Sequence, residues 1–282
     1  MKKKGQFSNI ILFVLFLAGL SLLLYPSLAN YINSKHQTVA IAAYSEKVSA
    51  IEEDDCESYW QDAIRYNAAI PGRVNQFAPS EEELTQYYRL LDPSGNGIMG
   101  YIEIPAIDVT LPIYHGAEEN VLQVGVGHLD WTSLPVGGED THCVLSGHRG
   151  LPRAKLFTHL DKLVEGDIFM LRVLDEVLTY EVDQILIVLP DESDELKIVP
   201  GADLCTLVTC TPYGINTHRL LVRGHRIETP EDVPTIRITA DAIQVDPLLV
   251  APVLIIPIII LAVVAVYLPK PGKGRRKGGE EV

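Results

Sequence analysis

The 282-residue sequence predicts a mainly β fold: a closed or nearly closed barrel, preceded by helices and flanked by two apolar segments. From residue 98 onward, short runs rich in β-branched and aromatic residues alternate with turns that contain Gly or Pro. Strands at such intervals are typical of a barrel, and about 130 residues can hold one barrel core. The expected strands are 100–104, 109–113, 142–146, 168–171, 178–182, 185–188, 204–210 and 219–223, with one helix at about 154–163.

The region before the barrel, from about residue 34 to 91, is predicted to be helical. Ala, Glu, Gln and Tyr are common there, and apolar residues recur at helical spacing. Pro71-Gly72 interrupts this pattern. A second helix is expected after Ser80, because Glu83 follows three residues later and the two form a capping-box pattern. The Gly-rich stretch 92–97 then predicts a loop.

Apolar segments lie near both ends of the chain. Three lysines precede the apolar core at Ile10–Tyr25, which fits either a short membrane helix or a signal peptide cleaved near the small residues 27–30. The second segment, 247–269, has 23 residues without a charge and is followed by five basic residues. The positive-inside rule then predicts two membrane spans, with both termini in the cytoplasm and residues of about 30 to 246 outside the cell.

The net charge limits the classes of partner. Eight of the 23 basic and two of the 37 acidic residues lie in the terminal segments, so the remaining chain carries a net charge of −20. Such a domain repels phosphate backbones, and we expect no nucleic-acid binding. The acidic surface either keeps the domain soluble or attracts a basic partner.

The chain has four cysteines, Cys56, Cys143, Cys205 and Cys210. An even number outside the cell is compatible with disulfides, but the spacing offers no Cys-x-x-Cys pair and no metal-ligand pattern. We expect no cofactor. Cys143 and Cys205 are predicted to be buried in strands, and Cys56 lies in a helical stretch. Cys210 differs, because it ends a strand-like run directly before a Thr-Pro-Tyr-Gly turn and is therefore suited to face a cleft.

Cys210, His148 and Arg219 form a candidate catalytic site. A thiol is nucleophilic as the thiolate, which a nearby imidazolium or guanidinium favours, and a cation can stabilise an oxyanion. His148 is preferred because the glycines at 147 and 150 allow the backbone to approach a ligand closely. By spacing alone, the competing residues are His128, His142, His159, His218 and His225, and the arginines Arg223 and Arg226.

Three segments together resemble the signature of the sortase family: 206–210 (Thr-Leu-Val-Thr-Cys), 146–148 (Ser-Gly-His) and 218–224 (His-Arg-Leu-Leu-Val-Arg-Gly). Further segments, 101–105, 111–116 and 150–157, resemble the pilus-type, class C branch. The resemblance covers residues of about 44 to 227. It implies an eight-stranded barrel in which Cys210 is the nucleophile, His148 the acid/base and Arg219 the clamp for oxyanion and substrate.

The resemblance also implies a reaction. Cys210 would attack the Thr–Gly bond of a Leu-Pro-x-Thr-Gly-type sorting signal and form a thioester. A lysine amine of another pilin subunit would then resolve the acyl-enzyme. The expected partners are therefore pilins or surface proteins that bear a sorting signal, a lysine-bearing acceptor pilin and the lipid bilayer.

One stretch departs from the class C pattern. Enzymes of that branch usually carry a lid before the barrel, in which Asp-Pro-aromatic plugs the site. The corresponding residues here are Asn75, Gln76 and Phe77, so the Asp and Pro are absent. The aromatic ring can still cover Cys210, but the charge that would pair with Arg219 is lost. We expect either a weakened lid that opens readily or a loop that only connects two helices.

Two other functions compete with pilin polymerisation. One is a sortase that attaches surface proteins to peptidoglycan, and the other is a non-catalytic scaffold for pilus assembly. The second apolar segment and the helical pre-barrel region favour the pilus-type enzyme. The expected organisation is a tail and first span (1–33), a helical region (34–97) with a candidate lid (75–77), a catalytic barrel (98–228), a linker (229–246), a second span (247–269) and a basic tail (270–282).

Overall fold

The structure is a computed structural model that describes residues 2–73, 76–151 and 154–230, with side chains from residue 12 onward. The chain divides into two compact units, residues 26–243 and residues 1–25 with 244–282. The predicted second span and basic tail, and nearly all of the predicted linker, lie outside the described residues.

Helix α1 (Lys2–Ser49) contains the predicted first span and continues, as one element, into the predicted helical region. Large apolar side chains between Leu12 and Tyr25 are exposed. Within the described residues, one helix, at Leu12–Ser49, is long and apolar enough to cross a membrane. The chain therefore carries an N-terminal apolar helix of the kind that anchors a protein to a membrane.

The second half of α1 packs along the barrel through one face. Asn30, Gln37 and Tyr44 are spaced by seven residues, so they lie on the same side of the helix. Each makes a hydrogen bond to the barrel region: Asn30 Oδ1 accepts from Lys155 N (2.9 Å), Gln37 Nε2 donates to Val124 O (2.9 Å), and Tyr44 Oη donates to Met99 O (2.8 Å) and accepts from Leu174 N (2.8 Å). These bonds fix the helix on the barrel surface.

The remaining pre-barrel region consists of α2 (Glu53–Ala69), the short 3-10 helix η1 (Ile70–Gly72) and α3 (Glu81–Tyr87). The predicted break at the Pro-Gly pair falls in η1. The predicted capping box is present, because Ser80 Oγ accepts from the backbone N–H of Glu83 while the Glu83 carboxylate accepts from the backbone N–H of Ser80. The helical prediction for this region is therefore confirmed.

Eight strands close into a barrel in the order β1-β2-β3-β4-β7-β8-β6-β5. They are β1 (Ile98–Ile104), β2 (Val109–His115), β3 (Val126–His128), β4 (Thr141–Ser146), β5 (Ile168–Val173), β6 (Glu176–Val188), β7 (Asp203–Thr211) and β8 (His218–Ile227). The short helical elements between them are η2 (Pro105–Ile107), α4 (Glu119–Leu122), η3 (Leu160–Lys162) and η4 (Asp194–Leu196). The eight-stranded barrel expected from the sequence is confirmed.

Three details differ from the sequence prediction. The two expected strands 178–182 and 185–188 are one strand, β6. A register shift between Val182 and Gln184 interrupts the alternation of side chains, and the sequence pattern therefore predicted two strands. Strand β3 was not expected, because three residues are too few to show an alternating pattern. The helix expected at 154–163 is wrong: only η3 is helical there, since an isolated bridge joins Leu151 to Ala154 and Leu156 has a φ of +37°.

The strands bury one face in the barrel interior and turn the other outward. On β7, Cys205 and Leu207 belong to the main core, whereas Val208 packs in a second, smaller cluster on the outer face. The outer cluster comprises Val144, Leu196, Val208 and Leu221, with Leu129, Trp131, Leu186 and Val188 packed against it. Because side chains alternate along a strand, Cys210 shares the outer face with Val208.

Candidate active site

Cys210 and Arg219 face each other across two antiparallel strands. Their Cα atoms are register partners in the pairing of β7 with β8. Side chains at such positions have Cβ atoms about 5 Å apart and lie on the same face of the sheet. Both side chains are half-buried, so they are held in place and still open to a ligand. The register thus places a thiol beside a guanidinium at one edge of the barrel.

The other three cysteines are buried free thiols. Cys143 and Cys205 lie opposite each other on the parallel strands β4 and β7, within the barrel core. Burial raises the pKa of the Cys205 thiol well above its usual range, and burial also raises the pKa of Cys56 in α2. Cys210 is therefore the cysteine that is most accessible for nucleophilic chemistry.

His148 lies level with Cys210 because β4 and β7 run parallel and stay in register to the end of β4. Beyond that point the Gly147 N–H donates to Val208 O at 3.0 Å, so the ladder continues. The Thr209 hydroxyl donates to Gly147 O at 2.7 Å. Gly147 is thus fixed beside Thr209, and we expect the next residues of the two segments, His148 and Cys210, to follow at the same level.

Arg149 connects the same two segments from the other side. Its Nη1 donates to Thr211 Oγ1 at 3.1 Å, and its Nη2 pairs with Asp161 Oδ2 at 2.6 Å. The arginine side chain is 9% exposed, so the contacts are largely shielded from water. The residues on both sides of His148 are therefore bonded to the residues on both sides of Cys210.

The loop that carries His148 also packs against Phe157. A Cβ atom on Gly147 would lie 2.6 Å from the Phe157 ring, so only glycine fits at this position without movement. The Phe157 N–H donates to His148 O at 3.1 Å. These contacts define the path of the loop at His148.

Glu119 in α4 is a partner of His148 that the sequence did not reveal. The His148 Nε2 and Glu119 Oε2 atoms are 3.3 Å apart, and the glutamate side chain is 68% exposed. No motif singles out Glu119 among the 37 acidic residues of the chain. This contact orients the His148 ring from the side of α4.

The guanidinium of Arg219 lies against the loop between β7 and β8. Its Nη1 donates to His218 O at 3.2 Å and to Asn216 O at 3.4 Å. The competing arginines have other contacts: Arg223 forms a bidentate pair with Asp183 at 3.0 and 3.1 Å, and Arg226 lies over the Tyr180 ring. Arg219 is thus the arginine that the fold places beside Cys210.

The competing histidines have other partners or positions, although His218 lies near the site because it pairs in register with Thr211. His128 and His142 are fully buried and hydrogen-bonded inside the protein, His128 to Tyr87 and Ser133 and His142 to Lys197 and Thr206. Burial lowers the pKa of His142, which disfavours the charged form. His159 lines a separate pocket, His218 contacts Thr217, and His225 lies 3.9 Å from Asp183.

The candidate lid is described in part. Asn75 lies outside the described residues. The Phe77 ring packs edge-on against Trp131, with 5.0 Å between the ring centroids. Trp131 in turn packs against the outer cluster that contains Val208, two residues before Cys210. Phe77 is therefore linked through Trp131 to the barrel face that carries the thiol.

A thiol, an imidazole and a guanidinium at the edge formed by β4, β7 and β8 are the groups that thiol-dependent acyl transfer uses. Comparison with known proteins agrees with that class. The sortase domain model matches residues 102–227. Sortase D of Bacillus subtilis is 30% identical over 138 residues, which cover 48% of this chain and 67% of the relative. The chain belongs to the sortase family and is a cysteine transpeptidase.

Solved structures of sortase C proteins are similar over most of the barrel and pre-barrel region. Sortase C1 of Streptococcus agalactiae is 48% identical with a TM-score of 0.66, covering 68% of this chain and 99% of the other. Sortase C of Streptococcus pneumoniae is 45% identical with a TM-score of 0.58, covering 67% and 97%. Clostridium perfringens sortase C, solved with a C-terminal cell wall sorting motif, is 45% identical with a TM-score of 0.58, covering 67% and 98%.

Proposed function

We propose that this chain polymerises pilins, with Cys210 as nucleophile, His148 as acid/base and Arg219 as the donor to the oxyanion. The observation that carries the proposal is the alignment of these three residues at neighbouring strand ends. The similarity to sortase C structures, one of which is described in terms of pilin substrate specificity, supports the choice of substrate. The substrate is a protein with a Leu-Pro-x-Thr-Gly-type sorting signal.

In the first step, Cys210 Sγ attacks the carbonyl carbon of the signal threonine. The electron pair of the carbonyl moves to oxygen, and the Arg219 guanidinium stabilises the resulting oxyanion through hydrogen bonds. Collapse of this intermediate breaks the C–N bond of the Thr–Gly peptide. His148 donates a proton to the departing glycine amine, and a thioester to Cys210 remains.

In the second step, the ε-amine of a pilin lysine attacks the thioester carbonyl. Neutral His148 accepts the proton of the attacking amine, and the C–S bond breaks to give an isopeptide bond and free Cys210. Glu119 supports both steps, because its contact with His148 Nε2 at 3.3 Å holds the imidazole ring in position.

The proposed topology has two spans, at the N-terminal apolar helix and at 247–269, with both termini in the cytoplasm. The positive charges outside each apolar segment support it. The barrel then lies outside the cell, where an exported pilin can reach Cys210. We further propose that Gln76 and Phe77, with Asn75, form a weak lid over the thiol. The contact of Phe77 with Trp131 supports this role.

The test uses purified full-length protein, a pilin with its sorting signal and an acceptor pilin. Wild type is expected to produce isopeptide-linked oligomers, and mass spectrometry locates the joined threonine and lysine. Cys210→Ala should abolish the linkage, whereas Cys56→Ala, which removes a buried thiol from α2, should retain it. Polymers formed by Cys210→Ala would exclude a catalytic thiol and favour a scaffold. Linkage only to a peptidoglycan amine would show a wall-anchoring sortase instead.

A further inference from the structure

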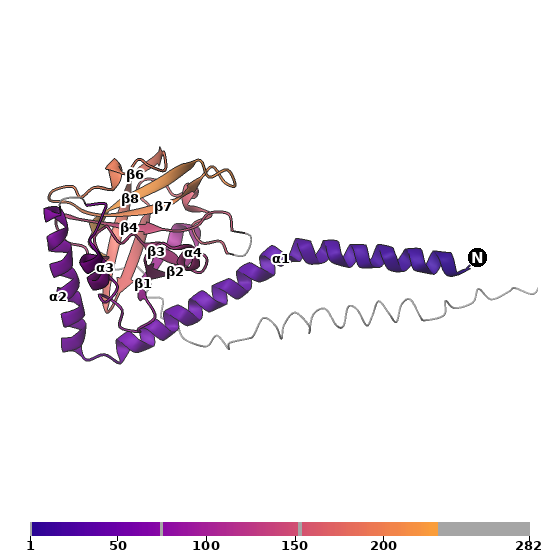
Figure 1. The fold of residues 1–282 in the computed structure, drawn as a ribbon, viewed down its shortest axis with the longest axis horizontal. Coiled ribbons are helices and arrows are strands. Elements are labelled where there is room, and N and C mark those ends of the chain that lie inside the picture. The colour runs from indigo at the N-terminus through magenta and orange to yellow at the C-terminus, as the bar shows by residue number, and fades with distance from the viewer. Residues whose placement is uncertain (1, 74–75, 152–153, 231–282) are drawn as a thin grey trace, which may run out of the picture. The chain divides into compact units, whose positions relative to one another are not determined.

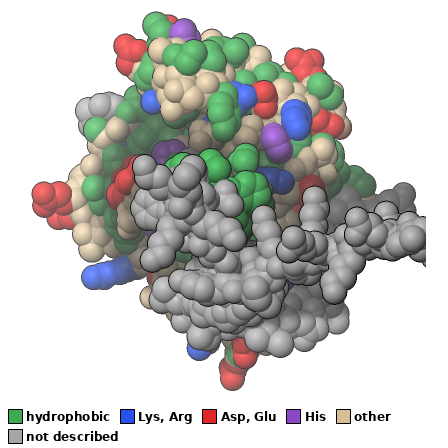
Figure 2. Space-filling view, turned by 90° about the vertical axis from the view of Figure 1, so that its right-hand side faces the viewer, with side chains coloured by type: hydrophobic (Ala, Val, Ile, Leu, Met, Phe, Trp, Pro, Cys, Tyr) green, Lys and Arg blue, Asp and Glu red, His purple; other side chains and the backbone are tan. Residues whose placement is uncertain are grey.

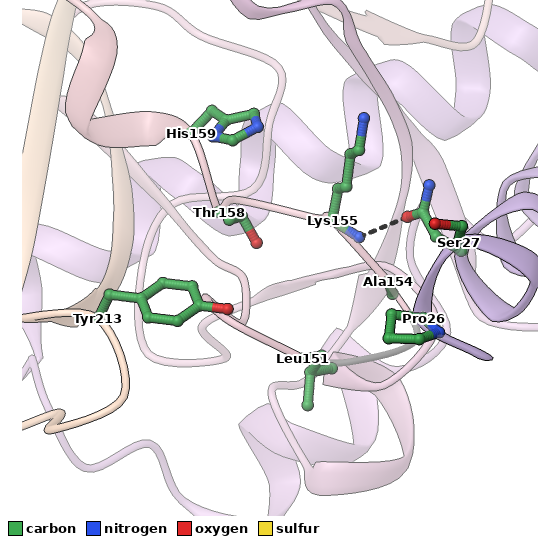
Figure 3. Close-up of a pocket in the computed structure, with 9 residues that line it drawn as sticks. Pro26, Ser27, Leu151, Ala154, Lys155, Thr158, His159 and Tyr213 are labelled. Carbon is green, nitrogen blue, oxygen red and sulfur yellow. Dashed lines mark hydrogen bonds between the residues drawn. The ribbon is translucent and has the colours of Figure 1, made fainter. Parts of the chain in front are cut away.

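A pocket of about 420 Å³ lies between α1 and the loop that follows the catalytic strand β4. Figure 3 shows that it opens among α1 at Pro26 and Ser27, the residues Leu151 and 154–159, and the ring of Tyr213. Its nine described lining residues are Pro26, Ser27, Asn30, Leu151, Ala154, Lys155, Thr158, His159 and Tyr213. The proposed chemistry at Cys210 does not use this pocket.

The pocket lining is rich in hydrogen-bond donors. It includes a lysine, a histidine, an amide and three hydroxyl groups, and the nine lining residues include no carboxylate. The Thr158 hydroxyl accepts from Gly150 N at 3.2 Å and can still donate its own hydrogen. Asn30 uses its Oδ1 to accept from Lys155 N, the dashed bond in Figure 3, so its amide NH₂ can also donate. Such a lining favours an anion.

Tyr213 is held at the pocket by a close approach to Gly150. A Cβ atom at Gly150 would lie 3.0 Å from the Tyr213 ring, and the φ of Gly150 is +84°, a region that favours glycine. Figure 3 shows the Tyr213 hydroxyl directed toward Ala154 and Pro26. The ring therefore forms one wall of the pocket and carries its hydroxyl inward.

The charge around the pocket is opposite to that of the rest of the domain. Residues 148–163 contain four Lys or Arg residues, two histidines and one acidic residue, although the chain between the terminal segments has a net charge of −20. On the face that Figure 2 views, basic and acidic side chains both occur, so the excess of positive charge belongs to the segment 148–163. This local positive charge repels a lysine amine and attracts an anion.

The position of the pocket along α1 indicates the source of that anion. No charged residue occurs from Gly5 to Ser34. The apolar core at Ile10–Tyr25 is the part of the helix suited to the hydrocarbon region of a bilayer. Pro26, Ser27 and Asn30 then follow at the depth of the headgroups in the outer leaflet, where phosphate groups are abundant.

We propose that this pocket binds the phosphate of an anionic phospholipid headgroup. Lys155 supplies the charge, Thr158 and Tyr213 supply hydroxyl donors, and Leu151 and Pro26 contact the first atoms of the lipid chains. Such a contact holds the segment around Lys155 at the membrane surface. This site goes beyond the proposed transpeptidase activity and does not depend on the reactivity of Cys210.

Native mass spectrometry of the full-length protein released from detergent micelles tests this site. Added phosphatidylglycerol should give a saturable adduct of one lipid per protein, and phosphatidylcholine should give a much weaker one. Lys155→Gln should lower the apparent affinity for phosphatidylglycerol about fivefold, the factor expected for one basic side chain at an anionic surface. Lys162→Gln is the matched control, because Lys162 is exposed on the same segment, has the same charge and does not line the pocket.

A second variant and a competing ion complete the test. Tyr213→Phe, which keeps the ring and removes the hydroxyl, should also weaken the adduct. Lys155→Gln and Tyr213→Phe should both unfold at the wild-type temperature, because Lys155 and Tyr213 are exposed. Inorganic phosphate at millimolar concentration should leave the lipid adduct intact. Equal affinities of Lys155→Gln and Lys162→Gln, equal binding of phosphatidylcholine, or full displacement of the lipid by inorganic phosphate would each overturn the proposal.

Discussion

Replacing Arg149 by methionine should show whether this side chain positions His148 in addition to stabilising the fold. Arg149 joins the loop of His148 to Thr211, which follows Cys210, and it pairs with Asp161. Methionine has a similar length but no donors, so the loop loses both connections. The expected result is a large fall in kcat with a small change in KM for the sorting-signal peptide, because binding surfaces persist while His148 and Cys210 lose their alignment.

The magnitudes follow from the contacts. Hydrogen bonds to charged groups contribute about 1.5 to 3 kcal/mol, and this figure is reduced here because the Asp161 side chain is 45% exposed. We therefore expect the free energy of unfolding to fall by about 1 to 2 kcal/mol. A displacement of about 1 Å between catalytic groups costs about 100-fold in rate, so kcat should fall about 10- to 100-fold.

Arg223→Met provides the control for lost stability alone. Arg223 makes two hydrogen bonds to Asp183, and both side chains are partly exposed, at 23% and 28%. Its loss should destabilise the protein by a similar amount and leave kcat within about twofold of wild type. Steady-state kinetics with a fluorogenic signal peptide, together with thermal unfolding, compares the two variants. If Arg149→Met shows the kcat of Arg223→Met, the arginine does not position His148, and the reasoning is refuted.

Three further predictions concern the lid, the docked helix and pH. Phe77→Ala should increase severalfold the rate at which a thiol reagent modifies Cys210, measured by mass spectrometry of the labelled peptide; an unchanged rate would remove Phe77 from the lid role. Tyr44→Phe should lower the free energy of unfolding by about 2 to 4 kcal/mol, because Met99 O and Leu174 N lose a buried partner; chemical denaturation that gives a loss below about 0.5 kcal/mol would contradict it. Burial lowers the pKa of His115 and His142 below the ordinary 6.5, so the unfolded chain binds more protons and stability should decrease as pH falls below about 6.5. Thermal unfolding between pH 7.5 and 5.0 measures this, and a constant midpoint would be inconsistent with the two buried imidazoles.

Local patterns predicted much of the fold. The alternation of apolar residues identified seven of the eight strands, although β6 was divided in two at its register shift. The Ser80–Glu83 pattern predicted the start of α3, because a capping box depends only on residues within one helical turn. The expected helix at 154–163 failed for the opposite reason: the bridge from Leu151 to Ala154 and the contacts of the segment with α1 override local preference.

The sequence by itself pointed to Cys210, because this cysteine ends a strand-like run directly before a turn. Spacing left several histidines and arginines open, and the resemblance to the sortase signature selected His148 and Arg219 among them. Only the tertiary structure decided how these residues meet, through the parallel register of β4 with β7 and the antiparallel register of β7 with β8. Glu119, which contacts His148, and the pocket beside α1 also emerged only from the fold. The physical reason is that such contacts join residues far apart in the chain, and their geometry is set by packing of the whole barrel rather than by any local pattern.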